Sequence, residues 1–426
     1  MKNINSRYKI AIVGLGYVGL PLALAFAKKF KVLGFDINKK RINSLKLGID
    51  YNNELKKDTL TKNFNLNYSY SSESLKSHNI FIITAPTPLT KNNRPDLNPL
   101  IRATKIVAKY MKKNSIVIFE STVYPGATEE VCIPIIEKIS KLKINKTFFC
   151  GYSPERINPG DKKRTLTKIK KIVSASNKKT LKKITLLYKK IISAGVYPVD
   201  TIKIAEAAKV IENTQRDLNI AFINELSFIF KKLKINTREV LKAASTKWNF
   251  LNFEPGLVGG HCVSVDPYYL TYKSKKIGYN PKIILSGRKV NNEVSRFICE
   301  ESIKEMKKKS INLKSAKILI GGLTFKKNCS DFRNSKVLDI YNILKKKVNR
   351  IDIYDPLVSS NEVLDKHRIV TVAKLSNKFY DGLILAVDHT SFRKKGIKFF
   401  KKSLKKKSFI FDVKGIFKSN ESDLSL

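Results

Sequence analysis

The sequence has 426 residues, 42% of them hydrophobic, and a formal net charge of +48. This length predicts two or three domains, and the apolar content is enough for proper cores. The charge alone would fit a nucleic-acid or membrane-surface protein. However, lysine is spread through every segment and no nucleic-acid-binding motif accompanies it, so we expect no nucleic-acid partner. An anionic substrate would still be attracted by this charge.

The five cysteines are scattered along the chain: Cys132, Cys150, Cys262, Cys299 and Cys329. No Cys-x-x-Cys pair and no paired histidine spacing indicates a zinc site or a disulfide framework. We therefore expect no bound metal and a reducing, cytoplasmic location, in which a cysteine can act as a free thiol.

The uncharged residues 10–27 are long enough to suggest a membrane span. Three glycines in a Gly-x-Gly-x-x-Gly spacing and a proline within them favour a strand, a tight turn and a buried helix instead. The short leader before them lacks the remaining features of a secretory signal. We expect no membrane segment.

The first elements predict a dinucleotide-binding unit. Residues 9–13 resemble a buried strand, and Gly14-Leu-Gly16-Tyr-Val-Gly19 lies between it and a helix that runs to about residue 29. Such glycines close the turn, admit a pyrophosphate and let helix pack on strand, and the helix N-terminus favours the anion. A second strand, residues 31–35, ends in Asp36, where a carboxylate accepts from ribose hydroxyls and repels a 2′-phosphate. The pattern predicts NAD rather than NADP.

Three further strands, at residues 79–84, 115–119 and 147–150, alternate with helical patterns as in a doubly wound parallel sheet. Ligands of such sheets lie beyond the carboxyl ends of the strands. Thr87 and Thr122 follow two of these ends and are candidates for cofactor contacts. Taken singly, each threonine also fits a turn or a helix cap.

Glu155 and Arg156 lie in a proline-bounded loop after the next strand. From spacing alone they fit either a functional loop or a surface ion pair.

Residues 201–233 predict one long helix, roughly 50 Å in length. It would join two domains and offer a dimer surface. Lys209 and Asn213 lie four residues apart, hence on one face. A lysine and an amide together can hold a developing oxyanion, although a solvated helix face fits the same spacing.

The segment Gly256-Leu-Val-Gly-Gly-His-Cys262 is the centre of the predicted chemistry, between helical patterns at residues 237–245 and 281–309. Gly259 and Gly260 let the backbone pass close to a ligand, and Cys262 then lies in a loop rather than a packed strand. Asp266 is near enough in sequence to share its pocket, and we expect Pro267 to stop the chain from running on. A lone cysteine is otherwise often a small buried hydrophobe.

The αβ alternation restarts after residue 310, with strands expected at residues 317–321, 350–354, 382–387 and 408–413 and a helix from about residue 334. Lys326 and Arg333 follow the first of these strands and could each meet a phosphate. The polar tail after Phe417 is expected to fray. The predicted fold is α/β: a Rossmann domain (1–199), a central helical domain with the long connecting helix (200–309) and a second Rossmann-like domain (310–426).

From about residue 9 to 414, the chain resembles the UDP-glucose/GDP-mannose dehydrogenase family. It is most similar to the UDP-N-acetylhexosamine 6-dehydrogenases, including UDP-N-acetylglucosamine 6-dehydrogenases, of bacterial capsule, O-antigen and Vi-antigen pathways. Residues 152–161, 205–217 and 256–262 carry this similarity. UDP-glucose enzymes usually have other residues after the proline–glutamate pair, so Arg156 and its neighbours indicate an N-acetylated sugar.

The resemblance implies a four-electron oxidation of the sugar 6-hydroxyl to a carboxylate with two NAD per turnover. Lys209 or a water bound to Asp266 would accept the alcohol proton in the first step. Cys262 would then attack the aldehyde to give a thiohemiacetal, whose oxyanion Lys209 and Asn213 would hold.

The second oxidation would leave a thioester, hydrolysed by a water that Glu155 activates. Thr122 or Asp266 would help to place that water. The identity of the base in each step stays open.

The resemblance also implies ligand positions. Those for the cofactor are Gly14, Gly16, Val18, Gly19, Asp36, Arg41, Thr87, Thr122 and Arg333. Those for the UDP-sugar are Glu155, Arg156, Lys209, Asn213, Gly256, Gly259, Gly260 and Lys326. Two departures from the wider family stand out: His261 precedes the cysteine where many UDP-glucose enzymes have serine, and residues 328–333 replace a more acidic, threonine-rich pattern.

The leading hypothesis is a cytoplasmic UDP-N-acetylglucosamine 6-dehydrogenase, a homodimer or a higher homo-oligomer, that acts in surface-polysaccharide synthesis. The same chemistry on UDP-N-acetylgalactosamine, UDP-N-acetylmannosamine or UDP-glucose is an alternative. A two-electron alcohol dehydrogenase would not need Cys262, Asp266 and Glu155 together. A basic binding protein that uses the folds as a scaffold would bind DNA in a salt-sensitive way without forming NADH.

Overall fold

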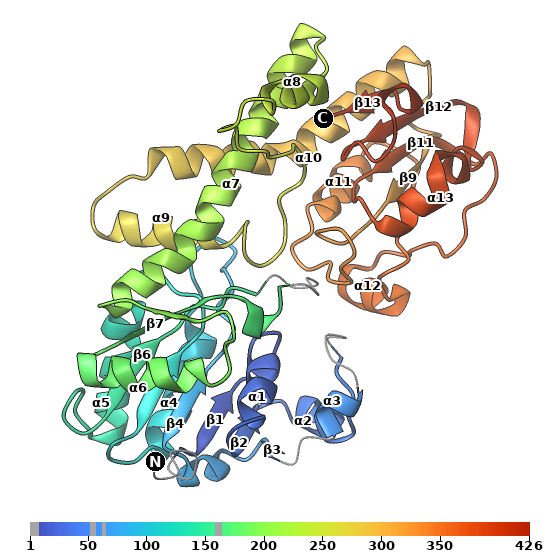
Figure 1. Ribbon diagram of the computed structural model, residues 1–426. Coiled ribbons are helices and arrows are strands. Elements are labelled where there is room, and N and C mark those ends of the chain that lie inside the picture. The colour runs from blue at the N-terminus through green and yellow to red at the C-terminus, as the bar shows by residue number, and fades with distance from the viewer. Residues whose placement is uncertain (1–7, 52–56, 62–64, 158–163) are drawn as a thin grey trace. The chain divides into compact units, whose positions relative to one another are not determined.

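The computed structural model describes residues 8–51, 57–61, 65–157 and 164–426. The chain folds into two compact units. The first comprises Met1–Glu212 and Tyr268–Tyr279, and the second Asn213–Pro267 and Asn280–Leu426. Figure 1 shows the course of the chain through both.

Among the described residues of the first unit, eight strands form one sheet in the order β3-β2-β1-β4-β5-β6-β7-β8. The strands are β1 (Ile10–Val13), β2 (Val32–Phe35), β3 (Leu66–Ser69), β4 (Ile80–Ile83), β5 (Ile116–Phe119), β6 (Phe149–Tyr152), β7 (Lys171–Ala175) and β8 (Val196–Pro198). All neighbours pair in parallel except β6 and β7, which are antiparallel. The predicted parallel sheet is therefore present, with one reversed pair.

Short runs of apolar residues explain the central strands. β1, β4 and β5 read IAIV, IFII and IVIF, and every one of their residues is buried. Strands covered on both faces carry such continuous apolar runs. The helices are α1 (Gly19–Ala27), α2 (Lys39–Lys46), α3 (Lys57–Thr61), α4 (Asn98–Tyr110), α5 (Ile133–Ser140) and α6 (Lys178–Lys189).

Long helices follow the first sheet. They are α7 (Ile202–Leu233), α8 (Thr237–Ala244), α9 (Asp266–Lys276) and α10 (Lys282–Lys308), labelled in Figure 1. The boundary between the two units falls within α7 and within α9. The expectation that Pro267 stops the chain is wrong, because α9 begins at Asp266 and Pro267 occupies its first turn. Proline is tolerated there, since the first N–H groups of a helix have no partner within the helix.

In the second unit, the described residues include a parallel sheet of five strands in the order β10-β9-β11-β12-β13. These are β9 (Lys317–Gly321), β10 (Arg350–Tyr354), β11 (Tyr380–Leu385), β12 (Leu404–Asp412) and β13 (Leu424–Ser425). The helices α11 (Val337–Leu344), α12 (Ser360–His367) and α13 (Thr390–Lys401) alternate with them.

Side chains alternate between the faces of this second sheet and form two separate cores. Ile318 and Ile320 of β9 pack in a core with residues of α10 and α11, whereas Leu319, between them, packs with residues of α13. This is the period of two that a strand imposes when helices cover both faces. The predicted doubly wound second domain is thus present.

The segment after Phe417 does not fray as expected. Leu424 pairs with Phe411 of β12, and Leu424 and Leu426 are both buried. Two leucines spaced by two residues can bury one face of a short edge strand, and this outweighs the polar residues around them.

The described helices also include none that is long and apolar enough for a bilayer crossing.

Candidate active site

The glycines after β1 differ in what surrounds them. Gly14 has a φ of +99°, which favours glycine, and a Cβ on Gly19 would lie 1.9 Å from the carbonyl oxygen of Gly14. A Cβ on Gly16, in contrast, would meet nothing within 4 Å. The outer glycines therefore serve the turn and its packing, while the space beside Gly16 is available to a ligand.

The start of α1 suits an anion. Val18 is the N-cap residue, and no side chain caps the helix there. The free N–H groups of a first turn and the helix dipole favour a phosphate at that point. Together with the open side of Gly16, this geometry fits the pyrophosphate of a dinucleotide.

Asp36 and Arg41 both bind the glycine turn. The Asp36 carboxylate accepts from the N–H of Leu15 at 2.8 Å and from the N–H of Asn38 at 2.9 Å. A carboxylate has about four lone-pair positions, so a half-buried Asp36 can still accept from a ribose hydroxyl. Arg41 donates through Nε to the Leu15 carbonyl at 3.1 Å, and its Nη1 lies 2.8 Å from Asp50. These Arg41 contacts are with the protein itself.

The two candidate threonines lie together beyond β4 and β5. Thr87 donates its hydroxyl to the Thr122 carbonyl at 2.7 Å. The carbonyl of Thr87 in turn accepts from the hydroxyl of Tyr269, in α9. The Thr87 hydroxyl thus connects the segments that follow β4 and β5. This is the structural role in a turn that the sequence left open for it.

A buried charged cluster follows the next strand ends. Lys171, the first residue of β7, places Nζ 2.7 Å from Glu120, 3.0 Å from the Pro154 carbonyl and 3.6 Å from Glu155. Tyr188 of α6 donates its hydroxyl to Glu120. Sequence patterns singled out only Glu155, since Lys171 and Tyr188 stand among many similar residues and Glu120 is marked only as part of a strand end.

Burial and charge act against each other in this cluster. Burial raises the pKa of Glu120 even though Lys171 opposes it. Burial lowers the pKa of Lys171, but the two carboxylates outweigh it and the net pKa is raised. The raised pKa of Glu120 favours its neutral acid, whereas the raised pKa of Lys171 favours its charged amine. Because three oxygens surround Nζ of Lys171, we conclude that Lys171 is an ammonium bound to Glu120.

Arg156 and Glu155 do not form the surface ion pair considered above. Arg156 binds Glu212 of α7, with its Nη2 2.8 Å from the carboxylate, and donates to the Lys170 carbonyl at 2.8 Å. Glu155 instead accepts from the backbone N–H groups of Arg156 and Ile157 at 2.6 and 2.5 Å. The rest of that motif, residues 158–161, lies outside the described residues.

Lys209 is buried on α7, with a relative exposure of 6%, which does not fit a solvated helix face. One turn before it, Glu206 is fully buried and accepts from the N–H groups of Gly126 and Thr128 at 2.5 and 2.9 Å. Burial raises the pKa of Glu206 to about 7. Glu206 thereby holds the turn that follows Thr122, a role that its place in the motif did not reveal.

Cys262 lies in a series of turns, as expected, and is partly exposed. Its carbonyl accepts from the N–H groups of Val265 and Asp266 at 3.0 and 2.8 Å. Asp266 is buried, and its carboxylate accepts from the side-chain amide of Asn213 at 2.6 Å. The second unit therefore brings together three of the predicted catalytic residues: Asn213, Cys262 and Asp266.

Glycines shape the loop before Cys262. A Cβ on Gly259 would lie 2.6 Å from the Asn334 carbonyl, and one on Gly260 2.7 Å from the Phe325 ring. Gly256 is bound on both backbone groups by Asn224, at 2.7 Å from its nitrogen and 3.1 Å from its oxygen. The glycines here permit close packing within the unit, and Asn224 fixes the start of the loop.

The two predicted phosphate ligands of the second unit lie in the loop after β9. Arg333 is held by Asp331 through two hydrogen bonds of 2.9 and 2.7 Å. Lys326 stacks near the ring of Phe325. Phosphate binding by Lys326 and Arg333 therefore stays a prediction. Among the described residues, no group of three or more His, Cys, Asp and Glu side chains is placed to hold a metal ion.

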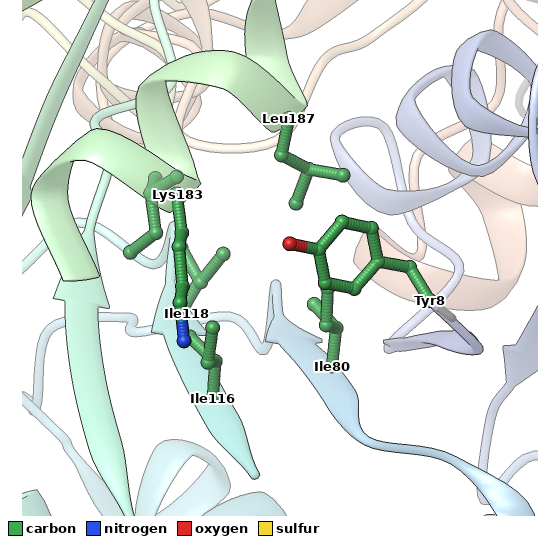
Figure 2. A pocket seen from close by; sticks show the side chains of 7 residues that line it. Tyr8, Ile80, Ile116, Ile118, Lys183 and Leu187 are labelled. Carbon is green, nitrogen blue, oxygen red and sulfur yellow. The ribbon is translucent and has the colours of Figure 1, made fainter. Parts of the chain in front are cut away.

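A narrow apolar crevice lies elsewhere. Figure 2 shows Tyr8, Ile80, Ile116 and Leu187 around it. Ile80 and Ile116 begin β4 and β5, so this crevice is at the amino ends of the strands. The candidate residues follow the carboxyl ends, where ligands of such sheets bind.

Models of one family cover most of the chain. The NAD-binding domain of the UDP-glucose/GDP-mannose dehydrogenase family matches residues 8–192, its central domain residues 203–293 and its UDP-binding domain residues 319–419.

Relatives match over nearly the full chain. The UDP-N-acetyl-D-glucosamine 6-dehydrogenase of Pseudomonas aeruginosa is 49% identical over 418 residues, 98% of this chain and 99% of the relative. The enzyme of the same name from Salmonella typhi is 50% identical over 418 residues, 98% of each chain. The solved structure of a UDP-D-ManNAc dehydrogenase from Pyrococcus horikoshii matches with a TM-score of 0.88 at 30% identity, over 96% of each chain.

Proposed function

Because this chain belongs to the UDP-glucose/GDP-mannose dehydrogenase family, we propose that it oxidises the C6 hydroxyl of UDP-N-acetylglucosamine to the carboxylate. That the chain is an NAD-dependent nucleotide-sugar dehydrogenase follows from the family itself. The choice of sugar is supported by one observation: two UDP-N-acetyl-D-glucosamine 6-dehydrogenases are 49% and 50% identical to it over 98% of its length.

Residues of the first unit would hold the cofactor. The pyrophosphate would lie beside Gly16 and the start of α1, and the Asp36 carboxylate would accept from the adenosine ribose. When bound, NAD accepts a hydride from C6 in each of the two oxidations. Thr87 and Thr122 are proposed as further contacts at this edge of the sheet, together with Val18 and Arg41. Arg333, a residue of the second unit, is also proposed as a cofactor contact.

Lys209 or a water held by Asp266 would take the alcohol proton in the first oxidation. Cys262 then adds its sulfur to the C6 aldehyde, which keeps this reactive group covalently bound. Lys209 and Asn213 donate to the oxyanion of the resulting thiohemiacetal, an effect typically worth a few kcal/mol. The 2.6 Å hydrogen bond from Asn213 to Asp266 supports this role, because it orients the amide.

The second oxidation leaves a thioester on Cys262, and water must cleave it. Glu155 is proposed as the base for that water, helped by Thr122 or Asp266. Its Oε1 accepts two backbone N–H groups, while its Oε2 accepts no hydrogen bond from the described residues. The second oxygen is therefore suited to receive a proton from water.

Substrate contacts are proposed for Lys326 and for the loop of Gly256, Gly259 and Gly260, with Arg156 recognising the acetylated sugar. We further propose a homodimer or a higher homo-oligomer, a cytoplasmic location and the three-domain division 1–199, 200–309 and 310–426. The product, a nucleotide-activated uronic acid, has the chemistry of a glycosyl donor, which supports a role in surface-polysaccharide synthesis.

The test is the ratio of NADH formed to sugar consumed. Purified protein with excess NAD is given UDP-N-acetylglucosamine, with UDP-N-acetylgalactosamine, UDP-N-acetylmannosamine and UDP-glucose in parallel. We expect two NADH per sugar and the highest kcat/KM on UDP-N-acetylglucosamine, and no carboxylate product from the Cys262→Ser variant. One NADH per sugar would contradict the cysteine chemistry, and a faster rate on another sugar would reassign the substrate.

A further inference from the structure

Two carboxylates of the first unit share one buried lysine. Glu120 follows β5, Glu155 follows β6, and Lys171 opens β7. The exposures of the three are 1%, 8% and 2%. One ammonium for two carboxylates leaves the cluster with an excess negative charge in a place where charge is costly. An arrangement that served packing alone would be more stable with equal charges or with none.

The lysine is shared unequally. Glu120 receives Nζ of Lys171 on one oxygen, at 2.7 Å, and the hydroxyl of Tyr188 on the other. Glu155 has Nζ at 3.6 Å, beyond hydrogen-bonding distance. The ammonium is thus hydrogen-bonded to Glu120 and makes only a longer ion pair with Glu155.

The same ammonium also holds the backbone that carries Glu155. Lys171 donates to the carbonyl of Pro154, the preceding residue, at 3.0 Å. Oε1 of Glu155 is fixed by the N–H groups of Arg156 and Ile157. The remaining oxygen, Oε2, is left near a positive charge and without a hydrogen bond from the described residues.

We propose that Lys171 is a positioning residue for Glu155: it orients the carboxylate through its charge and through the Pro154 carbonyl, while Glu120 and Tyr188 hold the ammonium 3.6 Å from Oε2. A hydrogen bond from the ammonium would occupy Oε2 and weaken it as a base. Without the ammonium, Glu155 would face Glu120 alone and would lose the cation that orients Oε2. This inference rests on the proposed function, in which Glu155 activates the hydrolytic water.

In that step an O–H bond of water breaks and its proton passes to Oε2 of Glu155. The water oxygen forms a bond to C6 of the thioester, and the C6–S bond breaks with its electron pair on the sulfur of Cys262. Lys171 keeps its proton throughout. Within the part of the chain that the structure describes, the charged and titratable groups that face Glu155 are Lys171 from β7, Glu120 from the end of β5 and Tyr188 from α6. The guanidinium of the adjacent Arg156 is bound to Glu212.

A charge-conserving variant tests the orienting role directly. Lys171→Arg keeps a cation beside Glu155 and should return toward the wild-type value the steady-state rate that Lys171→Met lowers.

Pre-steady-state kinetics separate the hydrolysis from the oxidations. The protein is mixed with UDP-N-acetylglucosamine and excess NAD, and NADH is followed from the first turnover. For Lys171→Met we expect an unchanged burst of NADH, an unchanged KM and a steady-state rate lower by tenfold or more. The exposed Lys182→Met on α6 is the matched control and should behave as wild type. Equal losses in burst and steady state, or a Lys171→Arg rate as low as that of Lys171→Met, would overturn the proposal.

Two further variants cover the case in which Lys171→Met does not fold and the case in which Glu155 is not the base. If Lys171→Met does not fold, Glu120→Gln/Lys171→Met removes one charge of each sign and should show the same slow hydrolysis after a normal burst. Glu155→Gln tests the underlying assignment: if it lacks a burst followed by slow turnover, Glu155 is not the hydrolytic base. That result would mark a failure of the proposed function rather than of the Lys171 inference alone.

Discussion

Asn213 donates its side-chain amide to the carboxylate of Asp266 at 2.6 Å. The bond connects α7 with the first residue of α9, and Asp266 itself donates its N–H to the carbonyl of Cys262. The amide of Asn213 is therefore oriented by a buried carboxylate whose backbone is bound to the cysteine turn. Such a fixed dipole can stabilise a developing charge without having to reorganise during the reaction.

Replacing Asn213 by alanine removes this donor and leaves Asp266 without one of its partners. We expect kcat for NADH formation to fall by about 10²-fold, the typical cost of losing an oxyanion donor, with a much smaller change in KM. The measurement is steady-state NADH formation on UDP-N-acetylglucosamine.

Asn219→Ala is the matched control for this change. Asn219 lies on the same helix and donates to the Gln215 carbonyl within it, so its loss should leave kcat close to the wild-type value. Equal changes in kcat and KM for Asn213→Ala would indicate a role in binding instead.

The glycines after β1 predict two different phenotypes. In Gly19→Ala, the new Cβ would lie 1.9 Å from the Gly14 carbonyl oxygen and 2.5 Å from the Thr84 hydroxyl oxygen. We expect Tm to fall by roughly 5 °C or more, since such overpacking costs about 1–3 kcal/mol. In Gly16→Ala, the new Cβ meets nothing, so Tm should stay within about 2 °C of wild type.

The same Gly16→Ala variant should bind NAD at least roughly tenfold more weakly, because its methyl group would occupy the approach of the pyrophosphate. Thermal unfolding and fluorescence titration with NADH measure the two effects separately. A Gly16→Ala protein with wild-type affinity would show that the cofactor does not pass this residue.

Local patterns predicted much of the fold. The runs Ile10–Val13, Ile80–Ile83 and Ile116–Phe119 are buried on both faces, and their apolar continuity is visible in the sequence. The reversed strand β7 was not visible in this way. Its pairing with β6 depends on which edge of the sheet is free, and a local pattern does not contain that information.

The candidate site also combines residues that a local pattern selects with residues that only the folded structure reveals. Glycines, Asp36, Cys262 and Asp266 belong to compact motifs, so spacing alone selected them. Lys171 was missed because one lysine among many gives no signal until its neighbours are known. Glu120 and Glu155 lie 35 residues apart in sequence, and only the parallel register of β5 and β6 brings their strand ends together.

The short edge strand β13 tests why the polar composition of the segment after Phe417 gave a wrong prediction. Leu424 and Leu426 were part of a segment expected to fray, yet both are buried against the second sheet. Leu424→Ala should lower the free energy of unfolding of this unit by about 2–3 kcal/mol. Ser425→Ala, a half-buried position between them, should change it by less than about 0.5 kcal/mol. Denaturant unfolding measures both, and equal small effects would mean that the edge strand adds little.

Glu206 makes stability depend on pH in a direction opposite to that of a salt-bridged acid. Burial raises its pKa from 4.5 to about 7 in the folded protein. Between these values the folded state binds more protons than the unfolded state, so stability falls as pH rises. The contribution is fully present below about pH 4.5 and is lost as pH passes 7. The change corresponds to about 3 kcal/mol.

The prediction is read from the Glu206→Gln variant, which cannot titrate. Between pH 5 and pH 8, wild type should lose about 3 kcal/mol of unfolding free energy relative to this variant, because all other groups titrate alike in both. Glu225→Gln, an exposed position on the same helix, should show no such pH-dependent difference from wild type. If the gap between wild type and Glu206→Gln is constant from pH 5 to pH 8, the carboxyl group is ionised throughout. The N–H groups of Gly126 and Thr128 would then outweigh its burial.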